Sequence, residues 1–416
     1  MERLPVRLTL TDDLRRSRLT VGFRLVLGLP HIVWFVLWSL FSFGISFVQW
    51  LVVLFTGEPT RGLHELYVRY IRYLVHVYAY MLLAADPYPG FFGRPGYPVD
   101  VEFDGPERQS RWKTGFRLLL AFPALMLAGV LLGSQPQRLG NTKYFLATPG
   151  LAAGAAFLAW FAVLASGRMP RGFRDLAAYA IGYTAQTYAY LFFLTARYPD
   201  SDPGHTPSTG PAPGHPVRVE VDDPLRRSRL TVFFRLALAA PHIVWLLLWS
   251  VVAFPTAILN WVATLVRGRS PAAFHRFLSR WLRYGIHVSA FLYLVGNPFP
   301  GFTGRAGRYP IDVVLPQAPQ RQSRWTTGFR IFLAIPALVI SSGLGGALAI
   351  VALLGWFASI FTGRMPGGLR NLGAFALHYQ AQLNAYVYLL TDRYPYSGPV
   401  GGEPDPVDEP AVALAA

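Results

Sequence analysis

Two arginines six residues apart recur four times in this 416-residue chain, each pair at the start of a long uncharged segment. The first arginine follows a serine, and the second is embedded among Phe, Leu, Ile and Val. A guanidinium at such a polar–apolar boundary needs a partner, and phosphate oxygens bind it in a bidentate manner. The candidates for binding anionic lipid or another anion are Arg18, Arg24, Arg111, Arg117, Arg229, Arg235, Arg324 and Arg330.

Two other roles are open for these arginines. Each can pair with an acid at the end of a preceding strand, such as Asp13, Asp104 or Asp223, and so pin that strand to its helix. They can also line a path for an anion, because charged groups within a membrane protein often mark such a path.

The sequence offers little for catalysis or metal binding. It has no Cys, and the long uncharged segments contain no Asp or Glu. No phosphate-binding loop, nucleophile elbow or H-E-x-x-H motif is present. A site built from His31, His76, His242 and His287 is conceivable, but the other two copies of the unit have Ala where His31 and His242 stand. We therefore expect no catalytic residue, no enzyme activity, no cofactor and no metal.

Composition indicates an integral membrane protein. Hydrophobic residues make up 53% of the chain and charged residues only 14%, against about 25% charged in ordinary soluble proteins. The net charge is +16, and lysine occurs only at Lys113 and Lys143. Because the arginines are spread at the predicted membrane boundaries and form no compact basic domain, we expect no binding to nucleic acid.

Internal similarity divides the chain into four units. SRLTVGFRLVLGLPHIVW from Ser17 matches SRLTVFFRLALAAPHIVW from Ser228, and SRWKTGFRLLLAFP from Ser110 matches SRWTTGFRIFLAIP from Ser323. The predicted organisation is repeat A (1–96), repeat B (97–199, with an extra loop at 134–150), a Pro/Gly-rich linker (200–215), repeat A′ (216–308), repeat B′ (309–397) and a disordered tail (398–416).

Each unit is predicted to contain a short β-strand, a transmembrane helical hairpin kinked at a proline, and a third helix that is interfacial or spanning. The polar insertion in repeat B favours a turn at the middle of each uncharged segment, because insertions are tolerated at exposed loop tips. The other copies have turn-permissive residues there, at Phe43-Gly44, at 254–256 and at 341–346. The fold class is therefore a mainly α integral membrane protein with four repeats.

Charge distribution predicts the topology. Arginines flank the start and the end of every predicted hairpin, which by the positive-inside rule favours eight spans with both termini and the linker in the cytoplasm. The insertion 134–144 then faces outside. The stripes Glu65, Arg69, Arg72, His76 and Arg276, Arg280, Arg283, His287 favour third helices lying in the interface. The strands near Val6, Val99, Val217 and Ile311 are expected to meet in one small cytoplasmic sheet. The alternative is twelve spans with repeats of opposite orientation.

The recurrent unit resembles the bacterial membrane family named domain of unknown function 4389. The resemblance is most complete in the fourth copy, at Ser323, Arg324, Phe329, Arg330, Pro336, Gly363, Met365, Pro366, Tyr386, Tyr394 and Pro395. The first and third copies depart from its G-R-M-P motif. The resemblance implies a multi-pass protein of the bacterial cytoplasmic membrane and implies no activity.

The expected function is that of a membrane scaffold, or of a protein that binds and organises anionic lipids through a basic cytoplasmic face. Its expected partners are membrane lipids, and a protein partner can also bind that face. The alternative is a transporter or channel for a small or anionic solute, which the internal duplication favours and the lack of intramembrane carboxylates disfavours.

Overall fold

The computed structural model describes residues 4–133 and 150–399. One order of elements occurs four times: a strand, a five-residue helix, a long apolar segment and a 21-residue helix. The first two sets are β1 (Val6–Leu10), α1 (Arg18–Gly22), α2 (Arg24–Thr56), α3 (Arg61–Met81), then β2 (Val99–Phe103), α4 (Arg111–Gly115), α5 (Arg117–Leu132), α6 (Leu151–Ser166) and α7 (Arg171–Leu191). After the 3-10 helix η1 (Pro203–His205), the last two sets are β3 (Arg218–Val221), α8 (Arg229–Phe233), α9 (Arg235–Arg267), α10 (Ala272–Leu292), β4 (Ile311–Val314), α11 (Arg324–Gly328), α12 (Arg330–Thr362) and α13 (Gly367–Val387).

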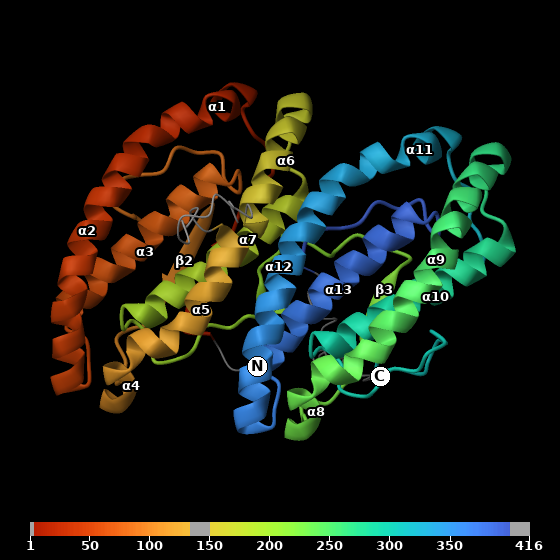
Figure 1. The fold of residues 1–416 in the computed structure, drawn as a ribbon. Coiled ribbons are helices and arrows are strands. Elements are labelled where there is room, and N and C mark those ends of the chain that lie inside the picture. Colours follow the sequence, from red (N-terminus) through yellow and green to blue (C-terminus); the bar gives the residue numbers. More distant parts are fainter. Residues whose placement is uncertain (1–3, 134–149, 400–416) are drawn as a thin grey trace, which may run out of the picture.

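The helices form a continuous row. Neighbours in contact follow the order α2, α3, α7, α5 with α6, α12, α13, α10 and α9, so the two halves of the chain meet where α12 packs on α5 and α6. In Figure 1, α2 and α9 lie at the outer edges, and α3, α7, α10 and α13 lie behind the longer helices. These 21-residue helices are mostly buried and rich in tyrosine, and they form the core.

Within the described residues, three helices are long and apolar enough to cross a membrane: α2, α9 and α12, with 33 residues each. The helices α5 and α6 are also apolar, with 16 residues each. All five expose apolar side chains, most extensively on α2 and α9, where Leu25 and Leu236 are each 76% exposed. Such a surface is that of a membrane protein, because soluble monomers rarely expose large contiguous apolar patches.

The predicted helical hairpins are wrong, and with them the eight-span arrangement. The segments 24–56, 235–267 and 330–362 are single helices that run through the expected turns at Gly44, Pro255 and Gly343. Glycine and proline mark turns only where water can solvate the backbone groups that a turn releases. In an apolar environment each unsatisfied group costs several kcal/mol, so the helix continues.

The insertion in the second set misled the prediction. Gly133 at the end of α5 is in backbone contact with Gly150 at the start of α6. Both helices pack on α7 and on α12, so together they follow the course of one long helix (Figure 1). The extra residues 134–149 lie outside the described residues, as does nearly all of the tail predicted to be disordered. An insertion here therefore separates two stacked helices and marks no reversal of the chain.

A break in each helical segment lies seven residues before the proline of the predicted kink. Each short helix is separated from the following helix by one phenylalanine, Phe23, Phe116, Phe234 or Phe329, with φ near −100° and ψ near 10°. Pro30, Pro123, Pro241 and Pro336 lie inside the helices that follow. Each proline removes only one hydrogen bond, which the helix tolerates.

The strands form two separate pairs and not the one sheet that was predicted. β1 pairs with β2 and β3 pairs with β4, both antiparallel. The first pair packs on α3 and α7, and the second packs on α10 and α13. Because the halves meet through α12, α5 and α6, the helices between the two pairs keep them apart.

The predicted linker packs against the helices. Asp202 accepts a hydrogen bond of 2.5 Å from the Asn371 side chain on α13. Thr209 accepts one of 2.8 Å from Arg174 on α7. Residues 200–215 therefore contact both halves of the chain instead of joining them loosely.

Candidate functional site

The second arginine of each pair is buried. Arg24, Arg117, Arg235 and Arg330 are only 1–3% exposed. Each lies in the first turn of a long apolar helix and donates to carbonyl groups just after, or at the end of, the next 21-residue helix. Arg330, for example, donates to the Tyr386 and Thr391 carbonyls at 2.9 and 3.0 Å. The last carbonyls of a helix lack partners within the helix and carry partial negative charge, so a buried guanidinium suits them.

Aromatic rings and polar side chains complete these four sites. The guanidinium carbon lies 4.1–4.4 Å from the ring centroid of Tyr80, Tyr190, Phe291 or Tyr386. Arg24 pairs with Asp86 at 2.9 Å and Arg330 with Asp392 at 2.8 Å, whereas Arg117 donates to Gln109. The partners proposed from sequence, Asp13, Asp104 and Asp223, are not the ones used. These arginines hold each long helix to the following helix, and their guanidinium groups face protein.

The first arginine of each pair is exposed. Arg18, Arg111, Arg229 and Arg324 all lie at the starts of the short helices. Arg18 donates to the Ala165 carbonyl at 3.0 Å, and Arg229 donates to the Phe361 carbonyl at 3.2 Å. Within the described residues, neither Arg111 nor Arg324 has a hydrogen bond or an ion pair through its side chain. The structure therefore divides the eight sequence candidates into four buried and four exposed cations.

Antiparallel packing brings further basic residues to the exposed four. The short helix α1 meets the end of α6, and the end of α2 meets α4. In the second half, α8 meets the end of α12 and α11 meets the end of α9 in the same way. Backbone bridges join Arg15 to Arg168, Arg226 to Arg364 and Arg269 to Arg321. We call the resulting groups the corner clusters: Arg15, Arg18, Arg168; Arg108, Arg111, Lys113; Arg226, Arg229, Arg364; and Arg269, Arg321, Arg324.

Sequence reasoning missed most of these partners. Arg168 and Arg364 each follow the glycine that ends a long apolar segment, a position that the sequence indicates only as a membrane flank. Which helix start each arginine would meet depends on tertiary packing between segments more than 100 residues apart.

Each corner cluster adjoins exposed apolar side chains. Trp112 is 76% exposed and Trp325 78%, and they directly follow Arg111 and Arg324. Leu19 and Leu230 take the same place beside Arg18 and Arg229, at 72% and 69% exposed. A cationic group beside an exposed aromatic or aliphatic side chain is suited to the boundary between lipid headgroups and acyl chains.

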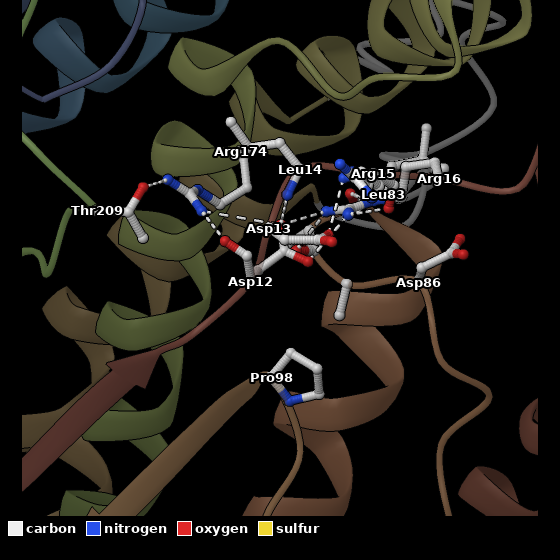
Figure 2. Close-up of polar contacts among 12 residues, drawn as sticks. Asp12, Asp13, Leu14, Arg15, Arg16, Leu83, Asp86, Pro98, Arg174 and Thr209 are labelled. Carbon is white, nitrogen blue, oxygen red and sulfur yellow. Dashed lines mark hydrogen bonds and ion pairs between the residues drawn. The ribbon is translucent and has the colours of Figure 1, made fainter.

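A buried ion network holds the first corner cluster in place. Arg16 pairs with Asp12 at 2.8 Å and donates to the Leu83 carbonyl, and both side chains are almost fully buried. Arg174 of α7 donates to the Asp12 carbonyl at 3.3 Å, and Figure 2 shows Arg16 and Arg174 both in contact with Asp12. In the second half Arg227 pairs with Asp223 at 2.7 Å in the same way. The exposed arginines therefore project from a rigid base.

The later residues of the polar stripes, Arg72 with His76 on α3 and Arg283 with His287 on α10, face the strand pairs. Asp100 of β2 contacts Arg72 at 3.1 Å and His76 at 3.0 Å, and Asp312 of β4 contacts His287 at 3.1 Å. Burial alone would raise the pKa of Asp100, but hydrogen bonds from His76 and from the Gly96 and Val101 backbone outweigh it and lower the pKa. These contacts tie each strand pair to a helix.

The histidines considered for a metal are engaged in separate places. His31 lies 3.2 Å from the Tyr73 hydroxyl, and His242 lies 2.8 Å from the Tyr284 hydroxyl. Over residues 4–133 and 150–399, no group of three or more potential metal ligands converges.

Comparison with known proteins yields one family. No curated protein and no solved structure matches the chain. The family model described as a domain of unknown function (DUF4389) matches three times, at residues 18–93, 229–303 and 324–397. The matches cover the exposed and buried arginines of three of the four sets and together more than half of the chain. The chain therefore belongs to the DUF4389 family and carries it in tandem copies.

Proposed function

We propose that this protein binds and organises anionic lipids at a bacterial cytoplasmic membrane, through the exposed arginines of the corner clusters. The observation that carries the proposal is an exposed arginine beside an exposed apolar side chain in every cluster. In three of the clusters a backbone bridge brings two further arginines together. The apolar side chains suit acyl chains, and the arginines suit the phosphate at the boundary.

Electrostatics favour an anion at the three clusters that have a backbone bridge, whereas in the second cluster Arg108 pairs with Glu58 at 2.7 Å. Like charges held close together repel, and Arg15, Arg226 and Arg269 each lie across a backbone bridge from another arginine. A phosphate relieves this repulsion and accepts two hydrogen bonds from one guanidinium. A basic residue near an anionic membrane surface contributes about 1 kcal/mol to binding.

Residues 97–199 are proposed as a fourth, diverged copy of the family unit. They carry the same elements in the same order, from β2 to α7, and the Arg111 and Arg117 pair at the equivalent positions. The insertion between α5 and α6 accounts for the divergence. On this proposal all four clusters have the same origin and the same lipid chemistry.

The test is lipid selectivity with a matched control. The fourfold variant R18Q/R111Q/R229Q/R324Q removes one exposed arginine from every corner cluster. The control R69Q/R94Q/R276Q/R305Q removes the same charge from exposed arginines outside the clusters. Native mass spectrometry of protein taken from mixed phosphatidylglycerol and phosphatidylcholine nanodiscs measures the enrichment of anionic lipid.

The cluster variant should lose about fivefold in phosphatidylglycerol enrichment per site, which corresponds to about 1 kcal/mol per arginine. The control variant should keep the enrichment of the unmodified protein. Equal enrichment in the cluster variant and the control would end the proposal.

A further inference from the structure

The exposed apolar surface follows the outer helices α2 and α9 along their whole length, and on α5, α6 and α12 it lies nearer their ends. Leu25 at the start of α2, Phe43 at its middle and Phe55 at its end are 76%, 77% and 72% exposed. A 33-residue helix is about 50 Å long, whereas the hydrocarbon core of a bilayer is about 30 Å thick. In the described part of the chain, no large exposed apolar side chain lies on α3, α7, α10 or α13. The apolar surface is therefore one broad face and not a belt around the molecule.

The opposite face is polar at mid-length of the helices. The strand pairs contact the 21-residue helices near their centres, through Arg72 and His76 on α3 and through Arg283 and His287 on α10. Outward from these contacts lie charged side chains such as Glu102 and Asp104, with 59% and 50% of their side-chain surface exposed. If the helices crossed the bilayer, these charges would stand near its midplane.

Such a position would be costly in two ways. A charged side chain at the centre of a spanning helix costs about 2.5–3.5 kcal/mol even on the most permissive scales. Both strands of a two-stranded sheet are also edge strands, with backbone groups that need water. Open sheet edges do not occur facing lipid. The strand face therefore needs water along the full length of the helices.

The positions of the basic residues are a third, independent argument against long helices that cross the bilayer. Because the long helices are antiparallel, the corner clusters lie at both of their ends. A crossing arrangement would place half of the clusters on each side of the membrane, against the strong one-sided bias of basic residues in membrane proteins. An arrangement parallel to the membrane places all four clusters at one interface.

We propose that the four long helical segments lie in the plane of the membrane, within one leaflet, and do not cross it. The partner of the apolar face is the acyl-chain layer of that leaflet. The corner clusters then lie at its headgroups, and the strand pairs, the linker and the described chain ends lie in water on the same side. This orientation does not depend on any preference of the clusters for anionic lipid.

Because the chain contains no Cys, single cysteines can report the orientation directly. Ser17 and Ser110 are exposed, occupy equivalent positions before α1 and α4, and lie at opposite ends of the paired long helices. In the S17C/S110C variant in sealed vesicles, an impermeant maleimide is added outside and the labels per molecule are counted by mass spectrometry.

The in-plane orientation gives molecules with two labels or none, whatever fraction of the protein faces outward. A crossing orientation gives one label on every molecule and overturns the proposal. The variant S228C/S323C repeats the test in the second half of the chain, in case the first variant does not fold.

The occupant of the apolar face is tested at Gly44, which is exposed at the middle of α2 with open space around it. A fluorophore on G44C should be quenched by nitroxide-labelled lipids and not by aqueous iodide. Protection from both quenchers would show a second copy of the chain on this face, and quenching by iodide would show water; either result overturns the proposal. A cysteine at the exposed strand residue, E220C, should label from water as fully as S228C on the same molecules.

Discussion

Replacing Arg330 with Gln should destabilise the protein far more than replacing Arg324 with Gln, although both changes remove one arginine from the same motif. Arg330 is 1% exposed and donates to the Tyr386 and Thr391 carbonyls, while Asp392 lies 2.8 Å from its guanidinium. Arg324 is exposed. Removing Arg330 leaves two buried carbonyls without their donor, at about 1–3 kcal/mol each, whereas Asp392, with 35% of its side chain exposed, can be solvated. Exposed substitutions stay within about 0.5 kcal/mol.

The magnitude can be converted to a melting temperature. The unfolding entropy of soluble proteins is about 2.1 cal/mol/K per residue, so a loss of about 4 kcal/mol lowers the Tm of a chain of this length by about 5 °C. The assay is thermal unfolding of R330Q and R324Q in a neutral detergent, where no anionic lipid can contribute. Lysine at 330 should recover only part of the loss, because it keeps the charge and loses the fork of donors. If R330Q and R324Q melt at the same temperature, the account of the buried arginines is refuted.

Three further changes have defined outcomes. N297D should raise the Tm by a few degrees. Asn297 stands where Asp86 and Asp392 pair with the buried arginine in other copies, and Arg235 has two buried nitrogens without hydrogen-bond partners. An unchanged or lower Tm would contradict this prediction. The D100N variant should lose less stability in acid than the unmodified protein does. Because the pKa of Asp100 is lowered in the folded state, its carboxylate stabilises the fold above about pH 4, and this stabilisation disappears as the pH falls through the lowered pKa. The free energy of unfolding is measured for both proteins between about pH 6 and 2. If it decreases equally in the variant and in the unmodified protein, the prediction is refuted. Deleting residues 134–149 should change the Tm by no more than about 2 °C, because Gly133 and Gly150 are already in contact, and a collapse of the fold would show that α5 and α6 do not stack.

Local features of the fold could be predicted from the sequence. The strands at 6–10 and 99–103 alternate apolar and polar residues, and the serine before each basic helix start is the N-cap of a short helix in the structure. Internal similarity predicted where each unit begins, since it depends only on the order of residues. The family model confirms tandem copies in three of the four places.

The long helices could not be predicted in the same way. Gly44, Pro255 and Gly343 are turn signals in water, but the same residues stay helical where every broken backbone hydrogen bond is left without a partner. Positive-inside reasoning then placed both ends of each supposed hairpin on one side. The structure places them about 50 Å apart at opposite ends of a helix.

Only part of the candidate site could be predicted from the sequence. Spacing identified all eight motif arginines, but burial separates Arg24 from Arg18 because only Arg24 reaches the end of α3. The bridge between Arg15 and Arg168 arises from packing of α1 on α6, which no local pattern encodes.

The most direct test of the in-plane orientation is the depth of the protein in the bilayer. Neutron reflectometry on a supported bilayer with deuterated acyl chains measures the depth of protein scattering density relative to the two leaflets. The account predicts protein density in one leaflet and in the water beside it, with the opposite leaflet intact. Protein density through both leaflets would contradict it.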